Sequence, residues 1–113
     1  MVTLPLSPRC DAPLQAGPLM LDPHGHMVSV DGNDVFLTVS EFGLLEALVR
    51  NPYRVLDRAS LWASVQRGAP GELPSEAALR AVDRHVARLR KKLRAVGHTR
   101  IQTMRHVGYR LVP

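Results

Sequence analysis

One segment of this 113-residue sequence carries an unbroken apolar stripe at helical spacing, and this stripe limits the possible folds more than any other feature. Apolar residues recur every three or four positions from residue 79 to residue 96, which places them on one face of an α-helix. They are Leu79, Val82, Val86, Leu89, Leu93 and Val96. Gly97 follows and predicts the end of the helix. The rest of the chain must therefore cover a long apolar helix face.

The opposite face of this predicted helix is cationic. Residues 79–113 hold ten Lys/Arg and a single acid, Asp83, for a local net charge of +9, whereas residues 1–78 carry −4. A basic helix surface is often merely solvated, but such surfaces usually mix acids among the bases. The near absence of acids here favours a polyanionic partner, and nucleic acid is the commonest one.

The first third of the sequence is predicted to form a small sheet behind a linker. Residues 1–18 contain four prolines and no sustained periodicity, which is typical of a flexible arm. Short apolar runs at 19–21, 27–30 and 35–37 alternate with turn residues and predict an antiparallel meander. We therefore expect a linker over residues 1–18 and one domain over residues 19–113.

Two shorter helices are predicted between the meander and the apolar stripe. Thr38 and Glu41 have the spacing of a capping box and predict a helix that ends near Arg50. Asp57 is the expected cap of a second helix, which runs through Val65.

The remaining segments are predicted to be a loop and a terminal hairpin. Residues 66–75 are rich in proline and glycine and predict a loop. Short strands at 101–103 and 109–112 predict the hairpin, with Arg105 near its tip.

Several other classes of protein and site find no support in the sequence. The lone Cys10 excludes an intrachain disulfide and a four-cysteine zinc module, which suits a cytoplasmic setting. No apolar run approaches the roughly 18 residues that span a bilayer, and the basic segment lacks the Trp or Phe of a membrane-surface helix. The cluster of Asp22, His24 and His26 is interpreted as a polar turn rather than a metal site. Neither a catalytic serine motif nor a cofactor motif is present, so no enzyme activity is expected.

Duplex DNA suits the cationic helix and the hairpin by its geometry. The major groove of B-DNA admits one helix, and an arginine fork binds both acceptors on the edge of guanine. Arginines early in the helix are the candidates for reading bases, and later basic residues are placed to meet phosphates. The first group is Arg80, Arg84 and Arg88, and the second is Lys91, Lys92 and Arg94. Arg105 of the hairpin is a candidate for a narrow minor groove.

Two motifs carry a family resemblance. Residues 80–93 read RAVDRHVARLRKKL and residues 101–110 read IQTMRHVGYR, and both resemble the carboxyl-terminal DNA-binding domain of OmpR/PhoB-type response regulators. The resemblance extends through residues 37–45 and 51–56 and covers the chain from residue 19 onward. It implies an α+β fold, namely a winged helix-turn-helix with an amino-terminal antiparallel sheet, three helices and a carboxyl-terminal β-hairpin wing.

The resemblance also implies a bacterial transcription regulator of a two-component system. Helix 79–96 would enter the major groove and wing 101–112 the minor groove, at the nucleoid in the cytoplasm. Together with the charge pattern, it makes ten residues of the helix and the wing the expected DNA-binding set. They are Arg80, Arg84, His85, Arg88, Arg90, Lys91, Lys92, Thr103, Arg105 and Tyr109.

The expected partner is double-stranded DNA with tandem half-sites, bound by a chain that is a monomer or weak dimer in solution. RNA polymerase and a receiver domain of a longer chain are further candidate partners. The alternative is a winged-helix module that binds an acidic protein or RNA.

The sequence departs from the family pattern at several positions. Ala87 stands where an arginine is frequent, and Arg84 where an apolar residue is frequent, so a shifted base preference is expected. His106 and Tyr53 each occupy a common glycine position, which matters if the backbone there has positive φ. The loop at 66–75 lacks the usual Trp-Gly, which weakens the expectation of a polymerase contact through it.

Overall fold

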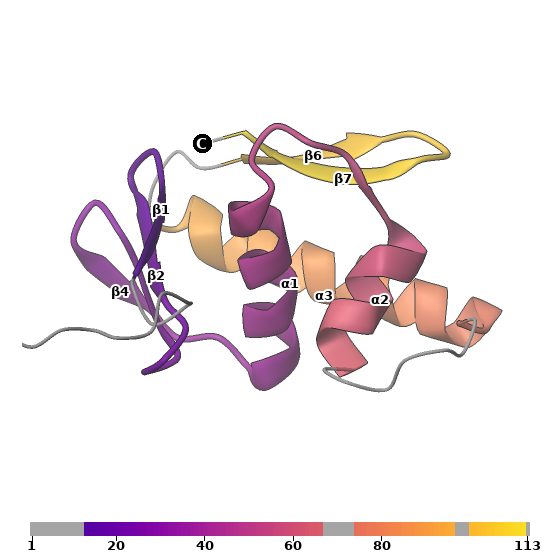
Figure 1. Ribbon diagram of the computed structural model, residues 1–113, viewed down its shortest axis with the longest axis horizontal. Coiled ribbons are helices and arrows are strands. Elements are labelled where there is room, and N and C mark those ends of the chain that lie inside the picture. The colour runs from indigo at the N-terminus through magenta and orange to yellow at the C-terminus, as the bar shows by residue number, and fades with distance from the viewer. Residues whose placement is uncertain (1–12, 67–73, 97–99, 113) are drawn as a thin grey trace, which may run out of the picture.

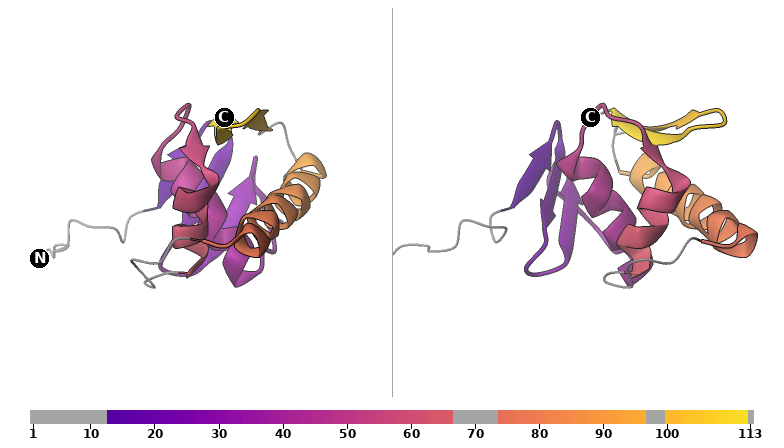
Figure 2. Two further views of the ribbon diagram at one scale, coloured as in Figure 1. Left: turned by 90° about the vertical axis from the view of Figure 1, so that its right-hand side faces the viewer. Right: turned by 45° about the vertical axis from the view of Figure 1, so that its right-hand side comes forward.

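The computed structural model describes residues 13–66, 74–96 and 100–112 of the chain. These residues form two small antiparallel sheets with three helices between them. Figure 1 shows the first sheet at one side of helices α1 and α2, with α3 passing behind both and a hairpin lying across the top. The right-hand view of Figure 2 shows the hairpin above α3, extending away from the first sheet.

The first sheet is a meander with the strand order β1-β2-β3-β4. Its strands are β1 (Leu14–Ala16), β2 (Leu19–Asp22), β3 (Met27–Val30) and β4 (Asn33–Val35). Side chains on β2 and β3 alternate between the core and solvent, as a strand with one covered face requires. The inward residues are Leu19, Leu21, Val28 and Val30, and the outward ones include Met20 and Met27.

Two details of the predicted meander are corrected. Residues 14–16, expected to belong to the linker, form β1, where Leu14 lies opposite Leu21 and Ala16 is buried. A strand of three residues is too short to show an alternating pattern, and the prolines on either side favoured the interpretation as a linker. The last strand covers Asn33–Val35 rather than 35–37, because a turn with positive φ at Asp31 and Gly32 lets pairing resume at once. Residues 1–12 lie outside the described part of the chain.

Helix α1 (Val39–Arg50) begins as predicted with a capping box. The backbone N–H of Glu41 donates to Thr38 Oγ1 over 3.2 Å, and the N–H of Thr38 donates to Glu41 Oε1 over 3.0 Å. These two bonds satisfy donors that a helix start otherwise leaves unpaired. Because they fix the side chain of Glu41 at the first turn, that carboxylate is held against the core.

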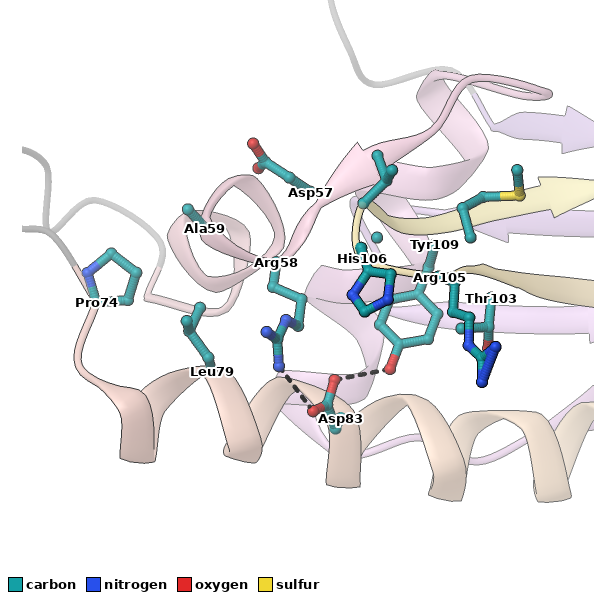
Figure 3. A pocket seen from close by; sticks show the side chains of 13 residues that line it. Asp57, Arg58, Ala59, Pro74, Leu79, Asp83, Thr103, Arg105, His106 and Tyr109 are labelled. Carbon is teal, nitrogen blue, oxygen red and sulfur yellow. Dashed lines mark hydrogen bonds and ion pairs between the residues drawn. The ribbon is translucent and has the colours of Figure 1, made fainter.

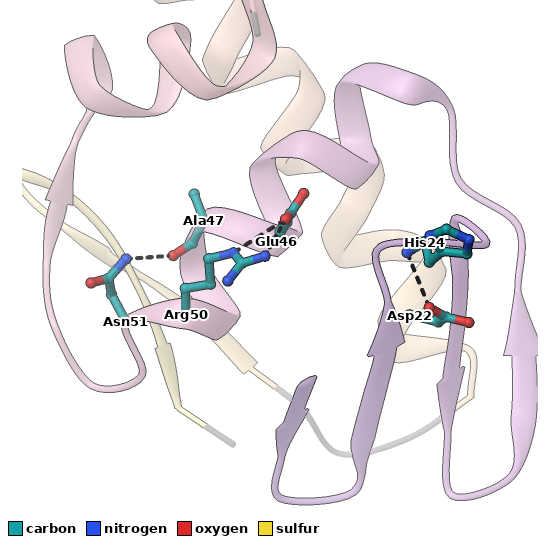
Figure 4. Close-up of polar contacts among 6 residues, drawn as sticks. All are labelled: Asp22, His24, Glu46, Ala47, Arg50 and Asn51. Atoms are coloured by element: carbon teal, nitrogen blue, oxygen red, sulfur yellow. Dashed lines mark hydrogen bonds and ion pairs between the residues drawn. The ribbon is translucent and has the colours of Figure 1, made fainter. Parts of the chain in front are cut away.

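Polar side chains make local contacts near the other end of α1 (Figure 4). Asn51 Nδ2 donates to the carbonyl oxygen of Ala47 over 2.8 Å, and Arg50 forms an ion pair with Glu46 over 2.8 Å. The polar turn predicted at residues 22–26 is also visible there, with the N–H of His24 donating to Asp22 Oδ1 over 3.0 Å. Within the described residues, no group of three possible metal ligands occurs.

Helix α2 (Arg58–Gln66) starts at the predicted cap, since the N–H of Ser60 donates to Asp57 Oδ1 over 2.8 Å. Helix α3 (Glu76–Arg94) is the predicted amphipathic helix, but its bounds differ from 79–96. It starts earlier because Ser75 caps it ahead of the first stripe residue, accepting the N–H of Ala78 over 3.1 Å. It ends at Arg94, two residues before the last residue of the stripe. Most of the predicted loop, residues 67–73, lies outside the described residues.

The second sheet joins the middle of the chain to its last strands, in the order β5-β7-β6. Strands β6 (Arg100–Met104) and β7 (Gly108–Val112) form the predicted hairpin, hereafter the wing. The added strand β5 (Leu56–Asp57) pairs Leu56 with Tyr109 and was not predicted, because two residues show no periodicity. A Cβ at Gly108 would lie 2.8 Å from both Asp57 Cα and the Leu56 carbonyl carbon, so only glycine lets these strands approach so closely.

The core confirms the predicted winged helix, because the apolar stripe of α3 belongs to one buried cluster with residues of both sheets and of the other two helices. The residues of α3 in this core are Val82, Val86, Leu89 and Leu93, and each is at most 1% exposed. The amino-terminal sheet, three helices and carboxyl-terminal wing all occur in the predicted order. No helix in the described part of the chain is both long and apolar enough to cross a membrane.

Candidate nucleic-acid interface

The solvent-facing side of α3 carries a row of exposed cations. Arg80, Arg84, Arg88 and Lys91 are all exposed, while the apolar stripe beneath them is buried. They lie three or four residues apart, so they follow one face of the helix. Nη2 of Arg80 lies 3.8 Å from Oε1 of Glu76, but both side chains are more than 70% exposed. An ion pair this exposed to solvent contributes little to stability. The row therefore remains available to a partner.

Arg90 lies on the flank of α3 that faces the wing. Its Nε donates to the carbonyl oxygen of Ile101 over 2.9 Å, and its Nη2 donates to the hydroxyl of Thr103. Its guanidinium also lies 5.4 Å from the centre of the Tyr109 ring, within the range of a cation–π interaction. Arg90 thus holds the wing to the helix, and the exposed Thr103 uses its hydroxyl in the same contact.

Lys92 lies on the opposite flank, against α1. Its Nζ is 2.6 Å from Oε1 of Glu41, whose side chain is only 1% exposed. Burial raises the pKa of Glu41, but the bonds from Lys92 and the Thr38 backbone outweigh it, so the pKa lies below its ordinary value. The carboxylate is therefore charged and paired inside the core, and Lys92 supplies its counter-ion.

His85 is half-buried on this same flank. Its Nδ1 is buried without a hydrogen-bond partner among the described residues. Burial lowers the pKa of His85, the charge of Arg88 lowers it further, and Glu41 only partly opposes this. The folded domain therefore favours the neutral form of the ring.

The tip of the wing presents Arg105 to solvent. Residues 104–107 form a tight turn closed by a 2.9 Å bond from the N–H of Val107 to the carbonyl oxygen of Met104. His106 occupies this turn with φ of 64°, and Tyr53 has φ of 68° in the turn after α1. Both departures from glycine thus fall at left-handed positions, where a side chain costs about 1–2 kcal/mol.

Tyr109, by contrast, faces inward. Its exposure is 9%, and its hydroxyl donates to Asp83 Oδ1 over 2.7 Å. The other oxygen of Asp83 accepts from Nη1 of Arg58 on α2 over 3.0 Å. Burial and the bond to Asp83 raise the pKa of Tyr109 to about 12, so the hydroxyl keeps its proton at neutral pH.

A cavity of about 470 Å³ opens between α2, α3 and the wing, as Figure 3 shows. Arg105 and Thr103 line it from the wing, and Leu79 and Asp83 from α3. Arg58 enters from the start of α2 and is a basic residue that the sequence reasoning missed. Its sequence signal was its place in the first turn of a helix, where the helix dipole disfavours a cation.

The ten predicted site residues therefore divide into three groups. An exposed group comprises Arg80, Arg84, Arg88, Lys91 and Arg105. A second group forms the contact between α3 and the wing and comprises Arg90, Thr103 and Tyr109. A third group, His85 and Lys92, packs toward the buried Glu41. At about 100° per residue, the exposed row of α3 lies between these two flanks.

Comparison with known proteins identifies the family of this chain. A profile of the family described as "Transcriptional regulatory protein, C terminal" matches residues 32–111. The chain belongs to this family. Sensory transduction protein RegX3 of Mycobacterium tuberculosis H37Rv is 37% identical over 103 residues, covering 89% of this chain and 43% of RegX3. The phosphate regulon regulator PhoB of Pseudomonas aeruginosa is 36% identical over 100 residues, with 88% and 42% covered. The chain spans less than half the length of these curated relatives.

Solved structures of the family agree with this fold. The DNA-binding domain of CpxR from E. coli superposes with a TM-score of 0.74 at 32% identity, covering 89% of this chain and 96% of that domain. The Klebsiella pneumoniae RstA DNA-binding domain, in complex with the RstA box, gives 0.72 at 28% identity, with 88% and 96% covered. The predicted membership in the OmpR/PhoB-type family is confirmed.

Proposed function

We propose that this domain binds double-stranded DNA sequence-specifically, as the DNA-binding part of a bacterial transcription regulator. The observation that carries the proposal is the row of exposed cations on α3 beside a wing that exposes Arg105 at its tip. A basic helix suits the width of the major groove, and an exposed arginine suits a narrow minor groove. The family assignment and the DNA complex of RstA support it.

Within this proposal, the three groups of residues have different tasks. Arg80, Arg84 and Arg88 meet base edges in the major groove, Lys91 meets phosphate, and Arg105 enters the minor groove. The groups around Arg90 and Lys92 mainly hold the binding surface in shape. Arg90, Thr103, Tyr109 and Lys92 already have polar partners within the domain, and His85 is half-buried beside Lys92.

The first test selects binding sites from a random duplex library and titrates salt against the selected and scrambled duplexes. We expect tighter binding to the selected sequence and a linear fall of log affinity with log salt concentration, as counter-ions are released. Equal affinity for all duplexes would refute specific DNA binding. Preference for single-stranded RNA or an acidic protein would favour the alternative function.

Two substitutions separate base reading from phosphate contact. Arg88→Ala is expected to cost about 1–3 kcal/mol on the selected duplex and much less on scrambled DNA. Lys91→Ala is expected to weaken both duplexes alike and to reduce the salt slope by about 1. Lys92 is a poorer probe of DNA contact, because its removal also leaves the buried carboxylate of Glu41 without its counter-ion and destabilises the fold. Equal losses for Arg88→Ala on both duplexes would remove its base-reading role.

The assembly on DNA is also a proposal. We expect a monomer or weak dimer in solution that occupies tandem half-sites about one helical turn apart. A receiver domain is the candidate regulatory partner, supported by the greater length of RegX3 and PhoB. Sedimentation with and without DNA tests the assembly, and a stable dimer without DNA would contradict it.

A further inference from the structure

We propose that Asp83 is a positioning residue, which fixes the wing against α3 through the hydroxyl of Tyr109 and so sets where Arg105 meets the DNA. The proposal rests on the proposed DNA-binding function and adds to it a device that aligns the two probes. It assigns a task to the only acid between residues 80 and 94 of the sequence.

The carboxylate of Asp83 joins three elements of the fold. One oxygen accepts the hydroxyl of Tyr109 on β7 over 2.7 Å, and the other accepts Arg58 on α2 over 3.0 Å. Both bonds are visible in Figure 3, where the side chain points from α3 into the cavity below the wing. Both partners therefore come from elements other than α3 itself.

An acid at this place has an electrostatic cost if the face binds DNA, because it repels phosphates near Arg105 and Arg58. The ion pair with Arg58 offsets the charge, although both side chains are about 40% exposed, so the pair itself adds little stability. Support of the helix is a poor explanation, since neither partner lies on α3. Among the described residues, Asp83 is the only acceptor of the Tyr109 hydroxyl.

The wing is fastened to α3 at two heights along the helix. Asp83 binds the Tyr109 hydroxyl, while Arg90 binds Ile101 and Thr103 of β6 and lies against the ring of Tyr109. Seven residues of helix separate the two points by about 10 Å. A single attachment leaves a hairpin free to pivot, whereas two separated attachments fix its angle to the helix.

The position of Tyr109 is transmitted directly to the tip. Tyr109 pairs with Thr103, and Gly108 pairs with Met104, so only the tight turn of residues 105–107 lies beyond the last paired residues. Because that turn is closed by its own backbone bond, Arg105 moves with the strands. Loss of the Tyr109 hydroxyl bond should therefore loosen Arg105 relative to the Arg80, Arg84 and Arg88 row.

The test measures how much the Arg105 contact is worth with and without the hydroxyl. Arg105→Ala is expected to weaken the selected duplex about tenfold in the wild-type background, within the range for a single groove contact. In a Tyr109→Phe background, which keeps the ring beside Arg90, we expect the same change to cost less than about threefold, because an unaligned wing contributes little. Arg88→Ala should cost the same factor in both backgrounds. Tyr53→Phe, which removes an exposed hydroxyl, is the matched control.

Two variants of Asp83 separate positioning from charge. Asp83→Asn keeps an acceptor for the hydroxyl, so Arg105→Ala should retain its full cost there, whereas Asp83→Ala should behave like Tyr109→Phe. A role of charge alone predicts that Asn and Ala behave alike, and that result would overturn the proposal. An unchanged cost of Arg105→Ala in Tyr109→Phe would also overturn it.

The failure of this inference is distinguishable from failure of the proposed function. A wild-type domain that does not discriminate among duplexes refutes both. A domain that discriminates normally while Arg105→Ala costs the same in every background refutes only the role of Asp83. Nuclear magnetic resonance of the free domain gives a second readout, since Tyr109→Phe should increase the motion of the wing amides relative to those of α3; unchanged wing motion would also overturn the role of Asp83.

Discussion

Replacement of Gly108 by alanine tests whether the wing is held by the close approach of β5. The added Cβ would lie 2.8 Å from Asp57 Cα and from the carbonyl carbon of Leu56, and nearer still to the Leu56 carbonyl oxygen. Ordinary carbon–carbon contacts are about 3.5–4.0 Å, so the strands must move apart by about 1 Å. Overpacking of this kind costs about 1–3 kcal/mol, and each ladder hydrogen bond lost adds about 1 kcal/mol. We therefore expect Gly108→Ala to lower the free energy of unfolding by about 3 kcal/mol.

Thermal and urea unfolding measure this effect, and Gly32→Ala is the matched control. A loss of this size should lower Tm by about 10–20 °C in a domain of this length. Gly32 has φ of 84°, but a Cβ added there would meet no atom of the described residues within 4 Å, so alanine costs only backbone strain, about 1–2 kcal/mol. Gly108 is not among the residues with positive φ, so its cost is steric. If Gly108→Ala is no more harmful than Gly32→Ala, the close approach of β5 does not hold the wing.

Three further changes test the flanks of α3 and one turn. Lys92→Met is expected to lower the free energy of unfolding by about 1–3 kcal/mol at neutral pH, because it leaves Glu41 buried without its partner. Lys91→Met is the control and should change this free energy by no more than about 0.5 kcal/mol. Urea unfolding measures both. Wild-type stability should fall as pH drops through the lowered pKa of Glu41, and an acid titration of Lys92→Met should lack this fall. Because burial lowers the pKa of His85, stability should also decline as pH falls below its ordinary value of 6.5; a His85→Gln variant that keeps this decline would contradict the assignment. Tyr53→Gly should raise Tm by a few degrees, since Tyr53 is 62% exposed and strained at φ of 68°; a lower Tm would show that its ring packs usefully.

The elements predicted correctly are those whose signal is local and repeated. The apolar stripe identified α3, and the caps at Thr38 and Asp57 identified the starts of α1 and α2, because the bonds involved span only three residues. The missed elements have signals of two or three residues. β5 becomes a strand only because Gly108, far along the chain, lets β7 approach it.

The candidate site shows the same division. Exposure of Arg80, Arg84 and Arg88 followed from their place opposite the stripe. The partners of Lys92 and Tyr109 could not be predicted, since Glu41 lies 51 residues from Lys92, and Asp83 lies 26 residues from Tyr109. Such pairs depend on how distant elements pack, and charge counting treats every cation of α3 alike.

The two-residue strand β5 has a consequence for exchange of parts among related domains. Asp57 pairs through its backbone with Gly108 of the wing, and its side chain caps α2. The wing is therefore not a detachable module, although it is a single continuous hairpin in sequence. A chimaera that imports only the hairpin would bring in a strand fitted to a different neighbour. Recombination boundaries that keep residues 56–57 together with 100–112 respect the unit that the fold actually builds.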